Sequence, residues 1–143
     1  MRIEDILARK ARPDVVTIGP AETVRALLGV LATNGIGACV VSPDGNRVEG
    51  IVSERDVVRR LHDDEDLLDA EVSSIMTPAV ETCAPDATVD EIMTVMTRRR
   101  IRHVPVVRDG TLTGIVSIGD LVKHRIDQLA FERDQLAAYV QQA

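Results

Sequence analysis

Aromatic side chains are almost absent from this sequence. One Tyr, one Phe and no Trp occur among 143 residues, and the formal net charge is −6 at pH 7. Proteins that bind single-stranded nucleic acid stack bases on aromatic rings, and an acidic chain has no general attraction for a phosphate backbone. We therefore expect no nucleic acid as a partner, and we expect any site for an anion to be local.

Cysteines and long hydrophobic runs are scarce too. Cys39 and Cys83 lie far apart and form no Cys-x-x-Cys pair, which argues against a zinc site and against a disulfide framework. No run approaches the roughly 20 apolar residues of a membrane-spanning helix, and residues 1–5 do not open a signal peptide. We expect buried thiols, no metal, no membrane association and a cytoplasmic location.

Catalytic fingerprints are also missing. The sequence has no Gly-x-x-x-x-Gly-Lys phosphate loop, no Gly-x-Gly-x-x-Gly dinucleotide motif and no Gly-x-Ser-x-Gly nucleophile turn. The composition is nevertheless that of a folded globular chain, with 45% hydrophobic and 28% charged residues. We therefore expect a folded protein that is not an enzyme and that requires no cofactor.

What the sequence does contain is an internal repeat. Residues 15–58 and 80–122 follow one pattern, in which the segment Gly50–Asp56 matches Gly114–Asp120. Each copy reads as a short strand, an amphipathic helix, two strands joined by an Asp-Gly turn, and a second helix. One such unit is too small to bury an adequate core alone, so the two copies are expected to share one.

The expected fold class is therefore α/β, more narrowly α+β, with two βαββα repeats related by a pseudo-twofold axis. Thr23 and Thr88 are expected to cap the first helix of each copy. The predicted strand pairs are 38–42 with 47–52 and 103–107 with 111–116.

Four segments follow from the repeat. They are a first repeat with its lead-in helix (1–62), an acidic linker (63–71), a second repeat (72–126) and a C-terminal helical extension (127–143). The acidic run in the linker is expected to be solvated rather than to bind a metal.

The last helix of the second copy is predicted to continue to about residue 140, well past its counterpart. Its apolar residues alternate spacings of four and three, as in the seam of a coiled coil, and only Arg133 interrupts them. The seam consists of Val122, Ile126, Leu129, Leu136 and Val140. Such a helix overhangs its own repeat, so we expect it to pack against a second subunit in a homodimer or to cross the repeats.

The order and duplication of these motifs resemble a pair of cystathionine-β-synthase (CBS) domains, also called a Bateman module. The resemblance rests on Ile75–Pro78, on Arg102–Val107 and on the two segments that begin at Gly50 and Gly114, and it covers about residues 3–126. It implies two clefts between the repeats that bind AMP, ADP, ATP or another adenosyl compound such as S-adenosylmethionine. It also implies regulation of another protein, which the sequence does not identify.

The resemblance further implies that Asp56 and Asp120 accept hydrogen bonds from the ribose hydroxyls, with Ser53 and Ser117 near the sugar or phosphate. A carboxylate suits this contact because charge-assisted hydrogen bonds are stronger than neutral ones. A purely local role is also open. A Ser followed three residues later by an acid can form a capping box at the start of a helix.

Positive charge for a phosphate is concentrated in the run Arg98–His103. The resemblance places Arg102 and His103 facing the phosphate, whereas the three preceding arginines fit a solvated basic helix end equally well. The matching positions of the first copy, Gly37-Ala38, carry no charge. The two clefts are therefore not expected to be equivalent.

Four further residues are candidates for contact with the ligand. Ile36 and Ile101 are placed to cover a face of the adenine, and Thr17 and Thr82 to contact the base or sugar, although ordinary packing in a sheet explains each as well. The sequence thus predicts a regulatory sensor that binds an adenine nucleotide or another adenosyl ligand. The alternative is a ligand-independent structural or protein-interaction module.

Overall fold

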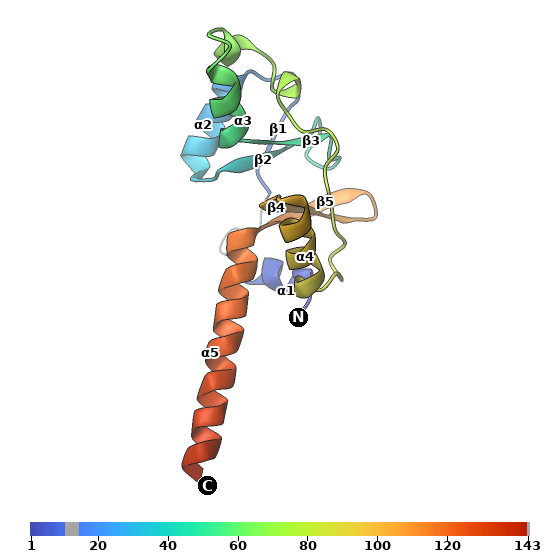
Figure 1. Cartoon of the computed structure of the whole chain (residues 1–143). Helices are drawn as coiled ribbons and strands as arrows, with labels where there is room; N and C mark the ends of the chain where they lie inside the picture. The colour runs from blue at the N-terminus through green and yellow to red at the C-terminus, as the bar shows by residue number, and fades with distance from the viewer. Residues whose placement is uncertain (11–14, 143) are drawn as a thin grey trace.

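Two small sheets lie next to each other in the middle of the molecule, with the helices on the outside (Figure 1). A computed structural model describes residues 1–10 and 15–142. The first half consists of α1 (Ile3–Ala8), β1 (Thr17–Ile18), α2 (Val24–Asn34), β2 (Ala38–Val41), β3 (Gly50–Ser53) and α3 (Glu54–Leu61). Two short 3-10 turns, η1 (Leu67–Asp69) and η2 (Val72–Ser74), lead to α4 (Val89–Arg99), β4 (His103–Arg108), β5 (Thr111–Ser117) and α5 (Ile118–Gln142).

The predicted α/β fold of two βαββα repeats is confirmed. In the first repeat the strand order is β1-β2-β3, with β1 parallel and β3 antiparallel to β2. In the second repeat β4 pairs antiparallel with β5. Its first strand is reduced to one parallel bridge between Cys83 and Val106, which corresponds to the pair Ile18 and Val41 of the first repeat.

Helix ends follow the predicted capping signals, with one exception. Thr23 accepts a hydrogen bond from the Ala26 amide at 3.1 Å, and Thr88 forms a capping box with Glu91. Helix α2 ends at Gly35 in the left-handed conformation, with φ of 61°. At the matching place after α4, where the sequence carries no glycine, Arg100 adopts the same conformation with φ of 55°. A non-glycine residue pays a steric cost there.

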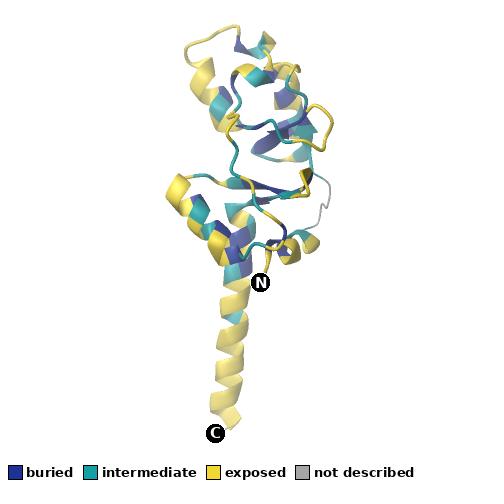
Figure 2. Ribbon diagram, turned by 90° about the vertical axis from the view of Figure 1, so that its right-hand side faces the viewer, coloured by how far each residue is buried: buried dark blue, intermediate teal, exposed yellow. Residues whose placement is uncertain are grey.

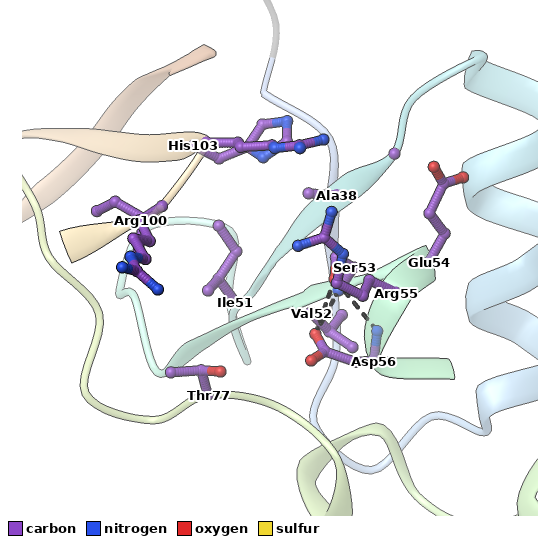
Figure 3. A pocket seen from close by; sticks show the side chains of 13 residues that line it. Ala38, Ile51, Val52, Ser53, Glu54, Arg55, Asp56, Thr77, Arg100 and His103 are labelled. Carbon is purple, nitrogen blue, oxygen red and sulfur yellow. Dashed lines mark hydrogen bonds between the residues drawn. The ribbon is translucent and has the colours of Figure 1, made fainter. Parts of the chain in front are cut away.

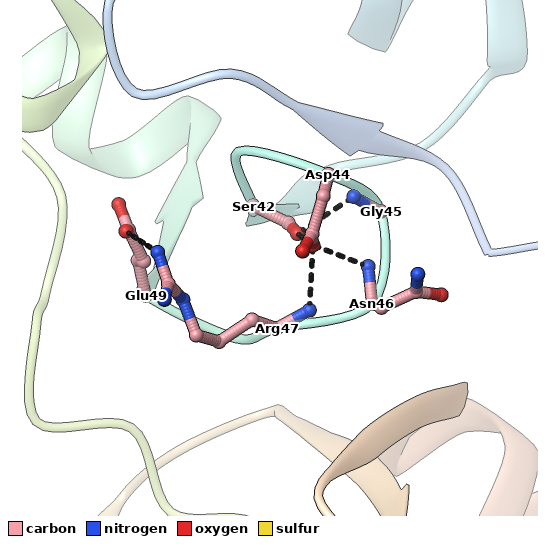
Figure 4. Close-up of polar contacts among 6 residues, drawn as sticks. All are labelled: Ser42, Asp44, Gly45, Asn46, Arg47 and Glu49. Atoms are coloured by element: carbon pink, nitrogen blue, oxygen red, sulfur yellow. Dashed lines mark hydrogen bonds and ion pairs between the residues drawn. The ribbon is translucent and has the colours of Figure 1, made fainter.

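The turn between β2 and β3 is held by Asp44 (Figure 4). Its Oδ1 accepts hydrogen bonds from the backbone amides of Arg47 at 2.9 Å and Asn46 at 2.8 Å, and these bonds lower the pKa of Asp44. Ser42 Oγ accepts a third bond from the Gly45 amide at 2.9 Å. The turn therefore has its own hydrogen-bond network, and Asn46 O also accepts a hydrogen bond from the Leu112 amide of β5 at 2.7 Å.

The N-terminal helix packs against the second repeat rather than the first. Ile3 and Ile6 of α1 belong to the core of the second repeat, whereas Leu67 and Val72 from the connecting segment belong to the core of the first. The Ile3 amide donates to Ala87 O at 2.9 Å, just as the Val72 amide donates to Glu22 O at 2.8 Å. The repeats therefore have two separate cores, so the expectation of one shared core is wrong. Each lead-in segment covers the opposite repeat, which ties the two halves together.

Helix α5 is one continuous helix of 25 residues, as the seam predicts. Only Leu121 and His124 are buried in it, and beyond them it projects away from the repeats (Figures 1 and 2). It therefore does not cross the repeats, because its apolar seam continues past the surface of the second core. None of the helices found in residues 1–10 and 15–142 has both the length and the apolarity to span a membrane.

Gly50, at the start of β3, leaves room for the segment that leads into the second repeat. A Cβ atom there would lie 2.6 Å from Met76 Sδ and 3.0 Å from the backbone oxygen of Thr77. We expect Gly50→Ala to lower the free energy of unfolding by about 2 kcal/mol, because overpacking displaces neighbours. Gly29→Ala is the matched control, since nothing lies within 4 Å of a Cβ there and α2 should gain stability. Urea denaturation followed by circular dichroism compares them, and equal stabilities would contradict this account of Gly50.

Candidate functional site

Two clefts lie where the repeats meet, and each combines parts of both. The Asp56 cleft, of about 290 Å³, joins the start of α3 to the segment Arg100–His103 of the second repeat (Figure 3). The Asp120 cleft, of about 360 Å³, joins the start of α5 to the segment Ile36–Ala38 of the first repeat. His103 lines both clefts. The aspartate of one repeat therefore faces the loop of the other.

Asp56 forms the predicted capping box and still has a carboxylate oxygen free. Its Oδ2 accepts hydrogen bonds from the Ser53 amide at 2.8 Å and from Ser53 Oγ at 3.0 Å. Within the described ranges no hydrogen bond reaches Oδ1. The local role and the predicted contact with a ribose are therefore compatible, because capping occupies one oxygen and leaves the other for a ligand.

Asp120 differs from Asp56 in having a cationic partner. Its Oδ2 accepts hydrogen bonds from the Ser117 amide at 2.9 Å and from Lys10 Nζ at 3.0 Å, and Lys10 also donates to Ile115 O at 2.9 Å. Burial raises the pKa of Asp120, but the bonds from Ser117 and Lys10 outweigh it and leave that pKa below its ordinary value. Asp120 is therefore a charged group that already has a cationic partner inside the chain.

His103, between the two clefts, has a pKa below its ordinary value, which favours the neutral imidazole. Burial lowers its pKa, the charge of Asp120 opposes that effect, and the charges of Lys10 and Arg102 reinforce it. A neutral imidazole can donate one hydrogen bond and accept another. His103 is thus suited to a phosphate as a hydrogen-bond donor rather than as a cation.

The charged residues around the two clefts differ. The Asp56 cleft is lined by Arg55, Arg100 and Arg102, whereas among the described residues the cation that lines the Asp120 cleft is Lys10. Arg55 and Lys10 were not predicted from the sequence. Lys10 lies 110 residues from Asp120, a separation that no local pattern reveals.

The structure brings together most of the predicted ligand contacts but not all of them. Ser53, Ile101 and Arg102 line the Asp56 cleft, and Ile36 and Ser117 line the Asp120 cleft. Thr17 lies in β1 and Thr82 on the exposed chain before Cys83, and neither lines either cleft. Thr77 lines the Asp56 cleft instead. The roles of all these residues in binding stay predictions.

The two cysteines are free thiols, Cys39 buried and Cys83 half-buried. Burial raises the pKa of each to about 11, so little reactive thiolate forms at neutral pH. Across residues 1–10 and 15–142 no group of three or more His, Cys, Asp and Glu side chains is arranged to hold a metal ion. The chemistry that these residues offer at the clefts is hydrogen bonding and charge.

In each cleft the Ser-x-x-Asp helix start of one repeat faces the loop before a strand of the other repeat. This arrangement defines a class of paired-repeat modules. The family model of the CBS domain matches the chain twice, over residues 3–63 and 72–127, and the chain belongs to this family. CBS domain pairs are ligand-binding regulatory modules.

Several known proteins are similar to this chain. The mitochondrial CBS domain-containing protein CBSX3 of Arabidopsis thaliana is 34% identical over 125 residues, which make up 84% of this chain and 61% of that protein. A CBS-domain protein of Agrobacterium tumefaciens is 43% identical, with a TM-score of 0.82 over 87% of this chain and 99% of that one. A CBS domain pair solved with 5′-methylthioadenosine and S-adenosyl-L-methionine shares the fold, at 22% identity and a TM-score of 0.78 over 90% and 98% of the two chains.

Proposed function

We propose that this chain is a regulatory sensor that binds an adenine nucleotide or another adenosyl ligand at the junction of its repeats. The observation that carries the proposal is the Asp56 cleft. There a carboxylate oxygen free to accept from a ribose lies in the same cleft as arginines suited to a phosphate. A similarly folded CBS pair holds adenosyl compounds, which supports the choice of ligand class. The module acts by binding and not by catalysis.

The proposal is tested by calorimetric titration with AMP, ADP, ATP and S-adenosylmethionine. We expect at least one of them to bind with a Kd in the range from micromolar to millimolar, about −8 to −4 kcal/mol. The absence of heat with all four, at protein concentrations that would detect such a Kd, would overturn the proposal. It would favour the ligand-independent interaction module instead.

A signal requires that the ligand bind one state of the protein more tightly than another. The two repeats supply such states if they shift relative to each other, because each cleft is built from both of them. Two subunits supply them as well, because α5 exposes an apolar seam through which they can pair. We therefore propose that the module is a cytoplasmic homodimer whose ligand changes its fit to a regulated partner protein.

We further propose that the Asp56 cleft is filled before the Asp120 cleft, because Lys10 competes with a ribose for Asp120. Lys10→Met keeps the length of the side chain and removes the competing charge. The number of nucleotides bound per chain should then rise from one to two in a calorimetric titration. Lys123→Met is the control, since Lys123 lines a neighbouring cavity together with Lys10 and Asp120 but forms no ion pair with Asp120. A loss of binding in Lys10→Met would mean instead that Lys10 contacts the ligand.

A further inference from the structure

A third cavity lies outside the two clefts, between the N-terminal helix and the start of α5. Helix α1 lies beside the first turns of α5 (Figure 1). The cavity between them has a volume of about 280 Å³, and we call it the outer cavity. Its charged and polar lining residues are Arg9, Lys10, Asp120, Lys123, His124 and Asp127. Only Lys10 and Asp120 of this set also line a cleft between the repeats, so the outer cavity is a separate place for a ligand.

His124 is the buried polar residue of the outer cavity. It is 9% exposed, and its Nδ1 is the one buried side-chain nitrogen or oxygen in residues 1–10 and 15–142 that has no hydrogen-bond partner. A proton on Nδ1 would have no acceptor there, so the neutral imidazole carries its proton on Nε2. The enclosed nitrogen thus fixes the tautomer in which Nε2 can donate a hydrogen bond to a ligand.

The charges around the outer cavity suit a ligand with a single negative charge. Three cations and two carboxylates line it, which is an excess of one positive charge. Lys10 and Asp120 offset each other across 3.0 Å, and Arg9 and Lys123 then outnumber Asp127. A carboxylate can accept hydrogen bonds from a guanidinium, an ammonium and an imidazole N–H at the same time. A second negative charge on the ligand would meet the carboxylates of the lining.

Lys10 connects the outer cavity to the Asp120 cleft, because its side chain lines both. Its ammonium group donates to Asp120 Oδ2 at 3.0 Å and to Ile115 O at 2.9 Å, which uses two of its three N–H groups. A carboxylate in the outer cavity can accept from the third and attract the ammonium group away from Asp120. Asp120 is then available to accept hydrogen bonds from a ribose.

We infer that the outer cavity binds a small monocarboxylate, and that this ligand promotes binding of a nucleotide in the Asp120 cleft. The site itself is independent of the proposed function, whereas the coupling to a nucleotide rests on it. Coupling between two ligands is reciprocal, so a nucleotide in the Asp120 cleft must tighten binding of the carboxylate by the same factor, about 5–150-fold in typical cases. The chain thereby responds to two ligands of different chemistry.

NMR of the protein with ¹⁵N-labelled histidine side chains tests the site, with acetate as the probe. We expect acetate to shift the Nε2 signal of His124 with a Kd of about 1 mM, and chloride at the same ionic strength to leave it unchanged. The exposed His62 is the internal reference. Arg9→Gln should weaken acetate about tenfold, whereas Arg59→Gln, at an exposed arginine of α3, should not. An unmoved His124 signal, or an equal shift with chloride, would overturn the inference.

Calorimetric titration with AMP, in the absence of acetate and at saturating acetate, tests the coupling. The number of AMP molecules bound per chain should rise from one to two when acetate is present. Lys10→Met should bind two under both conditions, because no ammonium group remains to be drawn away from Asp120. A single bound AMP at saturating acetate, with the His124 signal shifted, would overturn the coupling. A chain that binds acetate but no AMP would overturn the proposed function and the coupling, and would leave the carboxylate site standing.

Discussion

Replacing Asp56 with Asn is expected to weaken binding of the adenine nucleotide about 100-fold while the fold stays intact. The amide keeps one oxygen that can still accept the capping bond from the Ser53 amide, so α3 keeps its start. What the substitution removes is the charged acceptor of the hydrogen bonds from a ribose, because the group left facing the ligand is an NH2, which only donates. Each hydrogen bond to a charged group contributes about 1.5–3 kcal/mol. The loss from the two ribose hydroxyls together corresponds to a fall in affinity of about 100-fold.

Calorimetric titration of Asp56→Asn and Asp120→Asn with the same nucleotide provides the comparison. Asp120 is already paired with Lys10, so its substitution should weaken binding much less than that of Asp56. A 2′-deoxy nucleotide gives a second check, because it should bind the wild type weakly and Asp56→Asn with almost no further loss. If Asp120→Asn has the larger effect, the assignment of the primary cleft is wrong.

Much of the fold could be predicted because its signals are local and occur twice. The caps at Thr23, Thr88 and Ser53 depend on residues only three positions away, and the turn around Asp44 is held by side chains within it. The exchange of the lead-in segments could not be predicted. Ile3 and Ile6 would suit either core, and which core they enter depends on packing between distant parts of the chain.

The candidate site shows the same division between local and distant signals. The two Ser-x-x-Asp helix starts recur in the sequence, so they could be found without a structure. The crosswise pairing of each aspartate with the loop of the other repeat could not, because the repeat pattern describes each copy alone. Arg55 could not be recognised for the same reason, since the cavity that it lines is formed with Arg100 from the other repeat.

Deleting residues 127–143 is expected to convert a dimer into a monomer without destabilising the repeats. Beyond the last buried residue of α5, His124, the seam residues Ile126 and Leu136 are 60% and 66% exposed, so the deleted part contributes little to either core. Isolated apolar residues on a surface are ordinary, but an apolar seam that only Arg133 interrupts, on a helix that leaves the molecule, is typical of a coiled-coil interface. Multi-angle light scattering after gel filtration should give the mass of a single shortened chain for the deletion and the mass of two chains for the intact protein.

Two point substitutions on α5 test the seam itself and keep the helix. Leu129 lies on the seam, whereas Phe131 lies on the opposite side of the helix, and both are more than half exposed, at 55% and 62%. If the seam is the interface, Leu129→Ala should weaken the dimer at least about tenfold, as large-to-small changes in a packed interface do, while Phe131→Ala leaves it unchanged. Arg133→Leu should strengthen it, because it completes the apolar seam. A dimer that survives the deletion with its full mass would instead place the subunit contact on the repeats, and then the exposed seam would be open to the regulated partner.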